Sequence, residues 1–439
     1  MARPQKAGSQ SAAGYLSCCR PASFHIVQAI VLLPYILLSG QPSFFFSLTS
    51  MDRSSYILIC IPCLLVGGTE MQTLRLVEAL AQGGYQVVVC CYFEYHFNVV
   101  QQFKAAGANV VCLSAYGKRP DCQRKIRRFL RNGLKRVVEE YHPRVAHVQY
   151  MAPGALPLLY LHRLKVPTLL ATLHTSADIY TSLRPIHFLQ RHWVRAFTCV
   201  TLAAEKGFFG NSKLYAPQSP LDKHNHFTIY NCLGKTVEVS AENASANTAH
   251  MQGKAHGTSL THPVIGTVLR LENIKGADLV IPAFHIVRKT LAEARLIIVG
   301  DGKLRDTMQQ QQRDLNLPAD SIIWTGRITP NQLPEQYAQM DIAWVPSRSE
   351  GFGLSAVEAM ALGVPVVTSN IGGLSEIITD GKDGMLVPAE NVGALAERTI
   401  SLLQDASLLQ KVALAGCQRA QDFTFEKYKA NILSLYSKL

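Results

Sequence analysis

Short apolar runs of strand length alternate along this chain with segments of helical spacing. The predicted strands are residues 56–61, 86–92, 108–113, 144–149, 167–173 and 227–232 in the first half, and 264–268, 296–300, 322–326, 342–345, 364–368 and 385–387 in the second. Repeated strand–helix alternation is typical of a parallel sheet with helices on both faces. Since 439 residues suffice for two domains, we expect an α/β protein with two such sheets.

Composition divides the chain into segments. Residues 237–263 are rich in Ser, Ala, Asn, His and Gly and lack apolar periodicity, which predicts a flexible linker. The predicted organisation is an N-terminal extension at 1–50, a first domain at 51–235, the linker at 236–262, a second domain at 263–421 and a closing helix at 422–439. The extension fits three interpretations: an over-extended start before Met51, a membrane anchor or a cleaved secretory signal.

The strongest candidate for a ligand-binding site is the stretch of residues 344–367, WVPSRSEGFGLSAVEAMALGVPVV. The pattern predicts strand, loop, helix and strand, with Glu350 in the loop and Glu358 in the helix. The residues that lead into the helix are Gly351, Phe352, Gly353 and Leu354. Unpaired backbone N–H groups and the positive dipole end at a helix N-terminus suit a phosphate. Because the flanking carboxylates accept hydrogen bonds from hydroxyls, the stretch predicts a site for a sugar nucleotide.

The whole string resembles the donor site of the retaining glycosyltransferases of family 4. The resemblance is carried by Glu350 and Glu358 with seven residues between them, by GFG, by AMA.G.PVV and by the following SNIGGLSEIITDGKDGMLVP. It extends from Met51 to the C-terminus and is strongest in the second half. It implies the GT-B fold, in which two Rossmann-like doubly wound parallel-sheet domains face a central cleft. The competing interpretation is an ordinary βαβ unit with two solvated glutamates.

The resemblance also assigns residues outside this stretch. It implies that Arg270 and Lys275 bind the diphosphate, that the backbone at Gly326 and Arg327 cradles the nucleobase, that Gly68 approaches the phosphate across the cleft, and that His174 faces the donor sugar. Glu358 is expected to hold the ribose and Glu350 the sugar hydroxyls. His147 is expected to be structural. The sequence departs from the family at 231–234, where Asn-Cys-Leu-Gly replaces an Asn-Gly-hydrophobic-Asp turn, so contacts made by the missing Asp are in doubt.

These assignments imply a retaining hexosyl transfer in cell-surface glycan or glycolipid synthesis, from a nucleotide-diphosphate sugar such as a UDP-sugar to a saccharide or lipid-linked acceptor. The chain has no Asp-x-Asp, so we expect no metal and no other cofactor. Arg270, Lys275 and the helix N-terminus are expected to stabilise the leaving diphosphate. Attack on the same face, without an enzymic nucleophile, is the mechanism the resemblance implies.

Three other functions compete with this one. A GT-B nucleotide-sugar epimerase would share the donor site but need no acceptor. A dehydrogenase is disfavoured because the chain lacks GxGxxG after its first strand. A non-catalytic protein that binds sugar or membrane is disfavoured by the presence of both glutamates and both cations.

Net charge and cysteine content limit the classes of binding partner and the cellular compartment that fit this sequence. The net charge of +12 calls for an anionic partner, and the absence of nucleic-acid-binding signatures disfavours nucleic acid. The 11 Cys lack framework spacing, which indicates reduced thiols in a cytosol. Cys60 and Cys63 form a CxxC that predicts core packing better than a redox or metal site. We expect a protein that is cytoplasmic, or peripheral on the cytoplasmic face of the membrane.

Residues 124–138 predict a basic amphipathic helix. Its apolar stripe is Ile126, Phe129, Leu130, Leu134, Val137 and Val138, and the remaining faces carry seven Lys or Arg. A helix that covers the sheet with a solvated outer face explains part of this pattern. The excess of cations favours adsorption to an anionic lipid surface or recognition of an anionic acceptor.

Overall fold

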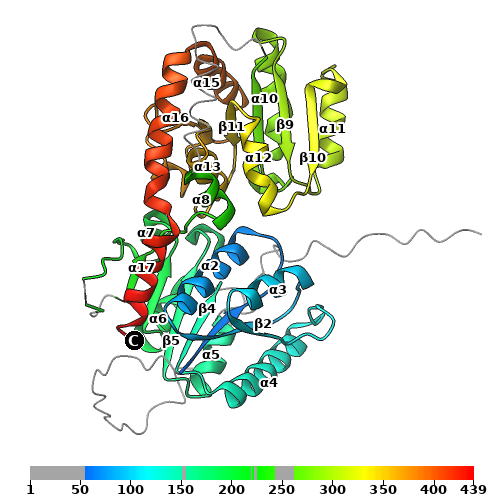
Figure 1. The fold of residues 1–439 in the computed structure, drawn as a ribbon. Coiled ribbons are helices and arrows are strands. Elements are labelled where there is room, and N and C mark those ends of the chain that lie inside the picture. The colour runs from blue at the N-terminus through cyan, green and yellow to red at the C-terminus, as the bar shows by residue number, and fades with distance from the viewer. Residues whose placement is uncertain (1–54, 151–154, 219, 222–224, 243–261) are drawn as a thin grey trace, which may run out of the picture.

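The computed structural model describes residues 55–150, 155–218, 220–221, 225–242 and 262–439. The predictions for residues 1–50 and for most of the linker lie outside these ranges. Two sheets form the centres of two domains, stacked one above the other in Figure 1. The strand orders are β3-β2-β1-β4-β5-β6-β7 and β10-β9-β8-β11-β12-β13, and the paired strands are parallel. The prediction of two doubly wound α/β domains is confirmed.

The strands of the first sheet are β1 (Tyr56–Ile61), β2 (Gln86–Cys91), β3 (Ala108–Cys112), β4 (Val145–Gln149), β5 (Thr168–Leu173), β6 (Ala196–Cys199) and β7 (His226–Thr228). Those of the second are β8 (Val264–Val268), β9 (Arg295–Val299), β10 (Ile322–Gly326), β11 (Ile342–Val345), β12 (Val366–Ser369) and β13 (Met385–Val387). The sequence pattern did not predict β6, because its four residues include a polar Thr198 and make no distinct apolar run. The strand predicted at 227–232 is shorter than expected.

Helices cover both faces of each sheet. In the first domain they are α2 (Gly68–Gln82), α3 (Phe97–Ala105), α4 (Gln123–Tyr141), α5 (Ala155–Arg163), α6 (Arg184–His192) and α7 (Leu202–Phe209). In the second they are α10 (Ala277–Thr290), α11 (Arg305–Asp314), α12 (Leu333–Ala338), α13 (Leu354–Ala361), α14 (Leu374–Ile377), α15 (Val392–Gln404) and α16 (Ala406–Ala420), with the short 3₁₀ turn η3 (Asn273–Lys275) before α10. Each sheet therefore separates two apolar cores.

Strand β1 shows how this double cover arises. Ile57, Ile59 and Ile61 belong to one core of the first domain, whereas Leu58 and Cys60 belong to the other. Successive side chains of a strand point to opposite faces, so a continuous apolar run is buried on both sides. Cys60 is thus a core residue, and Cys63, two residues after the strand, is also buried. The core-packing interpretation of the CxxC is consistent with both positions.

Two segments connect the domains. Helix α8 (Lys235–Glu242) follows the first domain, yet Leu233 and Val237 pack in a core of the second. The prediction of a linker without regular structure is therefore wrong for residues 237–242. At the other end, α17 (Phe425–Tyr436) continues down from α16 along the first domain, as Figure 1 shows. Its Leu435 and Tyr436 are buried in the first domain's core, so the closing helix returns to that domain as expected.

Candidate functional site

The loop between β11 and α13 carries the first predicted carboxylate. The Glu350 carboxylate accepts hydrogen bonds from Lys275 Nζ at 2.7 Å and Ser347 Oγ at 3.1 Å. The loop then turns at Gly353, whose φ of +109° lies in the region that favours glycine, and α13 begins at the next residue. Strand, turn and helix thus place Glu350 and Lys275 in contact, 75 residues apart in sequence.

Arg348, in the same loop, connects this loop to the 3₁₀ turn that carries Lys275 and to the start of α10. Its guanidinium pairs with both oxygens of the Asp278 carboxylate at 2.7 and 2.8 Å, with Glu390 Oε1 at 2.8 Å and with the Asn273 carbonyl at 2.6 Å. These pairs raise the pKa of Arg348 and lower that of Asp278. Because Asn273 and Lys275 lie in one 3₁₀ turn, Arg348 holds the turn that presents the cation. Sequence reasoning missed this residue, since one more cation in a polar loop carries no distinctive signal.

Glu358 lies on the first turns of α13 in a partly buried position. Burial raises its pKa to about 7. The Tyr337 hydroxyl is 3.4 Å from one of its oxygens and donates to the Ser355 carbonyl at 3.0 Å. A carboxylate with so little solvation gains strongly from additional hydroxyl donors. The position therefore suits the vicinal hydroxyls of a ribose.

Arg270 follows β8 and is about half exposed, with its guanidinium 3.2 Å from the Glu272 carboxylate. Its charge reaches across the cleft to Glu70 in α2. Burial raises the pKa of the Glu70 carboxyl, while the Cys63 thiol that donates to it at 3.2 Å and the Arg270 cation both act in the opposite direction. Arg270 therefore lies where it can bind an anionic group near the N-terminus of α2.

Backbone contacts join the loop of Glu350 to the first domain. A side chain at Gly351 would collide with the carbonyl oxygen of His174, so only glycine allows this approach. Thr201 Oγ1 donates to the Gly351 carbonyl at 3.2 Å. Gly68 opens α2 on the opposite wall, and a side chain there would touch Leu354. The structure thus brings the His174 carbonyl and Gly68 close to the loop and to the first residue of α13.

Glu376 makes a second link between the domains. Its carboxylate accepts from the backbone N–H groups of Leu202 and Ala203 at 2.8 and 2.9 Å, at the N-terminus of α7. Unpaired N–H groups and the positive dipole end make this a favourable place for a carboxylate. The residue belongs to the string SNIGGLSEIITDGKDGMLVP that contributes to the family resemblance, but no role was predicted for it. Only the tertiary structure could show that its partner is in the other domain.

Gly326 and Arg327 lie apart from this cluster. They end β10 and follow it, and β9 and β8 separate β10 from β11 in the sheet. Gly326 has a φ of +69°, and Arg327 is exposed. Both remain at the carboxyl ends of the parallel strands, where open α/β sheets bind ligands. A ligand that spans from Glu350 to this edge must therefore be elongated, as a nucleotide sugar is.

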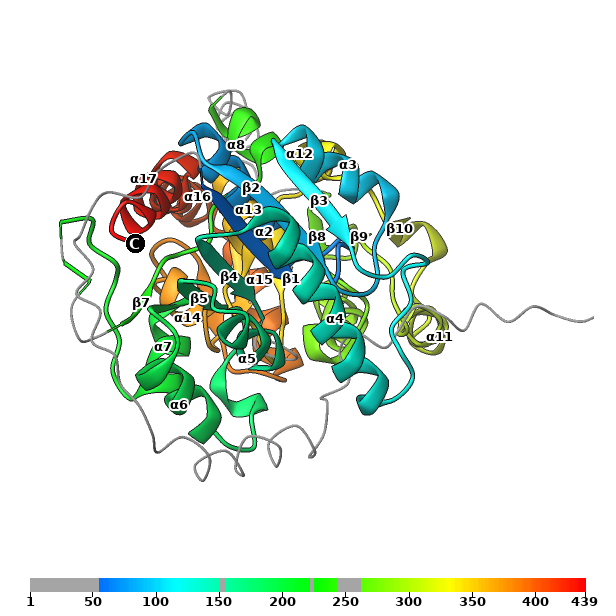
Figure 2. The same cartoon turned by 90° about the horizontal axis from the view of Figure 1, so that it is seen from below.

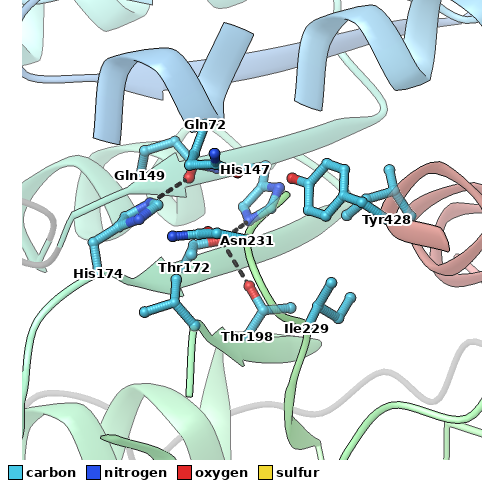
Figure 3. Close-up of a pocket in the computed structure, with 11 residues that line it drawn as sticks. Gln72, His147, Gln149, Thr172, His174, Thr198, Ile229, Asn231 and Tyr428 are labelled. Carbon is cyan, nitrogen blue, oxygen red and sulfur yellow. Dashed lines mark hydrogen bonds between the residues drawn. The ribbon is translucent and has the colours of Figure 1, made fainter. Parts of the chain in front are cut away.

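His174 follows β5 and lines a small polar cavity, seen in Figure 3. One ring nitrogen, Nε2, lies 2.8 Å from Gln149 Oε1, and burial lowers the pKa of the imidazole to about 3. His147 lies deeper, hydrogen-bonded to the Tyr436 and Thr172 hydroxyls, and burial lowers its pKa to about 3 as well. His147 is thus tied into the packing of α17, in agreement with its expected structural role.

The turn that departs from the family pattern is held by α2. Gln72 donates through Nε2 to the Cys232 carbonyl at 2.6 Å and accepts from the Cys232 N–H at 3.0 Å. Asn231 is buried and lines the cavity beside His174. A side-chain amide thus fixes the backbone of this turn.

Among the residues that the structure describes, neither a metal-binding cluster nor a membrane-spanning helix is present. No three His, Cys, Asp or Glu side chains gather there as a metal site would require. No helix in those ranges combines the length and the apolar character needed to cross a bilayer.

The geometry can be compared with known proteins. Residues 252–419 match the family described as glycosyl transferases group 1, and residues 66–205 match the family described as glycosyltransferase family 4. A GDP-mannose-dependent α-(1-6)-phosphatidylinositol monomannoside mannosyltransferase of Mycolicibacterium smegmatis is 34% identical over 167 residues. That match covers 36% of this chain and 44% of the relative, so the chain spans less than half of the relative's length.

A more extended match is the N-acetyl-α-D-glucosaminyl L-malate synthase of Bacillus anthracis, 25% identical over 71% of this chain and 77% of the relative. Among solved structures, Anabaena Alr3699/HepE in complex with UDP and glucose has a TM-score of 0.69 and 18% identity, covering 87% of this chain and 99% of that one. WaaG, a glycosyltransferase involved in lipopolysaccharide biosynthesis, has a TM-score of 0.61 and 15% identity, covering 83% and 95%. These likenesses confirm the GT-B arrangement of the two domains.

Proposed function

We propose, from the premise that the chain belongs to the group 1 glycosyltransferases of family 4, that it transfers a hexosyl group from a nucleotide-diphosphate sugar to a saccharide or lipid-linked acceptor. The main support for this proposal comes from the loop that precedes α13. There Glu350 accepts a hydrogen bond from Lys275, and Gly351 lies against the backbone carbonyl of His174. Groups for a phosphate, a sugar and a ribose converge there from both domains.

Each residue of the site has a proposed role. Glu358 accepts from the ribose hydroxyls, and Glu350 accepts from hydroxyls of the donor sugar. Lys275, Arg270 and the N-terminus of α13 stabilise charge that grows on the leaving diphosphate, without a metal ion. The ion pairs Lys275–Glu350 and Arg348–Asp278 hold Lys275 and its turn in place before the reaction, so this cation is preorganised. Gly326 and Arg327 receive the nucleobase at the outer strand of the sheet.

Retention of the anomeric configuration is part of the proposal. The acceptor oxygen would approach the face from which the diphosphate leaves, so the departing phosphate can take the acceptor's proton. Family membership supports this route. Measuring the configuration of the new glycosidic bond by NMR tests it, and an inverted product would contradict it.

The acceptor is proposed to be lipid-linked and bound at an anionic membrane surface. Helix α4 supports this idea, because Leu130, Leu134 and Val137 are buried against the domain while Arg124, Lys125, Arg128 and Arg131 are exposed. Figure 1 and Figure 2 place α4 at the end of the first domain farthest from the second domain. Because these cations lie far from the donor loop, they are better placed to bind a membrane surface than the reacting group of an acceptor. A relative that acts on a phosphatidylinositol monomannoside fits the same picture.

The decisive experiment is product analysis with a panel of nucleotide sugars. The full-length protein is incubated with each donor, with and without saccharide and lipid acceptors, and the products are identified by mass spectrometry. A new acceptor mass shifted by one hexose, together with release of nucleoside diphosphate, supports the proposal. Conversion of the donor into an isomeric nucleotide sugar without acceptor would instead identify an epimerase. No turnover of any donor, despite nucleotide binding, would favour the non-catalytic alternative.

A further inference from the structure

Gln149 is the last residue of β4 and pairs in register with Thr172 of β5, next to the strand end that carries His174. It is 2% exposed, and its Oε1 lies 2.8 Å from His174 Nε2. Figure 3 shows this contact at the edge of the polar cavity. Within the described residues, Nε2 is the ring nitrogen of His174 that has a hydrogen-bond partner. The contact therefore controls which nitrogen carries the proton.

The nitrogen of the same side-chain amide also needs a hydrogen-bond partner. Gln149 Nε2 is buried and has no hydrogen-bond partner among the described groups. It borders a cavity of about 20 Å³ that is also lined by Gln72, Thr198 and Asn231. A polar cavity of that size holds one water molecule, which such an amide donor and the neighbouring polar side chains can bind. A water molecule there would satisfy Nε2 and keep Oε1 turned toward the imidazole.

We propose that Gln149 is a positioning residue that keeps His174 in the neutral tautomer protonated at Nε2, so that Nδ1 accepts a hydrogen bond from a hydroxyl of the donor sugar. An amide oxygen can only accept, so the imidazole must donate from Nε2. In neutral imidazole the remaining nitrogen is then an acceptor. The identity of the bound hydroxyl rests on the proposed glycosyltransferase function, whereas the tautomer does not.

A neutral amide at position 149 also keeps the imidazole of His174 uncharged, as the proposed role requires. A carboxylate there would stabilise the imidazolium, which has no acceptor nitrogen. The titratable neighbours of His174 include His147, where a charge on either imidazole disfavours a charge on the other, and Tyr150, whose ring centroid lies 5.6 Å from that of His174. The remaining groups around the cavity are amides, hydroxyls and apolar side chains. Burial lowers the pKa of His174 to about 3, so the ring is neutral under ordinary conditions.

The tautomer is tested directly by nitrogen NMR on full-length protein labelled at histidine, with His174→Asn used to assign the signal. We expect Nε2 of His174 to be protonated and Nδ1 to be bare in the wild type. In Gln149→Leu the preference should weaken or reverse. Gln72→Leu is the matched control, because Gln72 borders the same cavity but bonds Cys232, and it should leave the His174 tautomer unchanged. A wild-type signal from protonated Nδ1, as a flipped amide would give, overturns the proposal.

Kinetics provide the second test, once a donor is known. Gln149→Leu should lower kcat/KM for the donor about tenfold. Gln149→Glu should bring the pKa of His174 into the accessible range, so that its activity relative to the wild type is near unity at high pH and drops as the pH falls, beyond the decline that both proteins share through Glu358. Identical pH profiles for the Glu variant and the wild type would contradict the positioning role. If the wild type transfers no sugar at all, the proposed function fails while the NMR result still decides the tautomer.

Discussion

The second-domain wall of the cleft holds its groups by ion pairs, whereas the first-domain wall holds His174 with a neutral amide. On the second-domain wall, Lys275 pairs with Glu350, and Arg348 pairs with Asp278 and Glu390. On the first-domain wall, the corresponding contacts are Gln149 to His174 and Thr172 to Thr198. The difference fits the proposed ligand: a diphosphate needs cations, and cations need partners that fix them. The sugar hydroxyl proposed to meet His174 needs only a neutral acceptor at that position.

Removal of Lys275, the cation paired with Glu350, should lower activity more than any other change on the ion-paired wall. Lys275→Met is expected to lower kcat by about 10²–10³, because a preorganised group at the leaving diphosphate is lost. Glu350 also loses its partner, so the double variant Lys275→Met/Glu350→Gln should cost less than the two single losses combined. Steady-state kinetics check both expectations. The exposed Lys382 in the same domain provides the control Lys382→Met, and equal activities of the two methionine variants would exclude Lys275 from the site.

Glu358→Gln should separate binding from stability. We expect the affinity for nucleoside diphosphate to fall about tenfold or more, since a charge-assisted contact to the ribose is lost. In the wild type this affinity should decline as the pH drops below about 7, where Glu358 becomes protonated, and in the variant this dependence should disappear. Calorimetric titration across pH measures both effects. Unchanged affinity would remove Glu358 from the nucleotide site.

The same variant should be more stable than the wild type at alkaline pH. The folded-state pKa of Glu358 is raised, so the native state binds more protons than the unfolded state between the two pKa values. Stability due to this group is therefore present at low pH and lost as the pH rises through about 7. We expect Glu358→Gln to raise the free energy of unfolding by about 1–3 kcal/mol at pH 8 and to change it little near pH 4. Denaturant titrations at both pH values measure it; a variant less stable at pH 8 would contradict the expectation.

Glu376 offers a test of how the two walls stay together. Glu376→Gln keeps one acceptor for the N-terminus of α7 but loses the charge, so the donor KM should rise about threefold to tenfold with little change in fold stability. Kinetics together with small-angle scattering would detect a more open molecule. Glu397→Gln, at an exposed position of the same domain, is the control. If both variants behave alike, the link across the cleft does not influence donor binding.

The cations of α4 should matter for the membrane and not for the donor site. Full-length protein is expected to co-sediment with anionic vesicles at low salt and to be released at high salt, because each exposed cation contributes about 1 kcal/mol near such a surface. Replacing Arg124, Lys125, Arg127 and Arg128 by Gln should abolish co-sedimentation and leave donor hydrolysis intact. Wild-type protein that ignores anionic vesicles would make α4 a solvated face and would favour a soluble acceptor.

The smallest expected effect is that of a chelator. With Arg270, Lys275 and the helix N-terminus in place, excess EDTA should change the initial rate by less than about twofold. The control is the same assay with added manganese or magnesium after chelation. Activity that disappears with EDTA and returns with manganese would show that the cationic wall needs a metal ion.

Several parts of the site were readable from the sequence because the residues that act together lie close in the chain. The strand, turn and helix around Glu350 and Glu358 follow from apolar runs, from Gly353 and from local capping rules. The pair Arg270 and Lys275 was assigned by the resemblance to the family. Where the pattern was weak, as for β6 and α8, the prediction was incomplete or wrong. Short elements of low apolar content take their structure from the surface on which they pack.

From the sequence alone, two parallel sheets and most of their strands and helices could be predicted, because local periodicity and turn residues encode these features. Which residues meet across the cleft and at the strand ends depended on the tertiary fold. The tertiary structure brought Gln149 to His174, Glu376 to the N-terminus of α7 and Gly351 to the His174 carbonyl, across 25 to 177 residues of chain. Such contacts depend on how strand ends and domains pack, and an amide or a carboxylate that finds its partner that way leaves no periodic signal in the sequence.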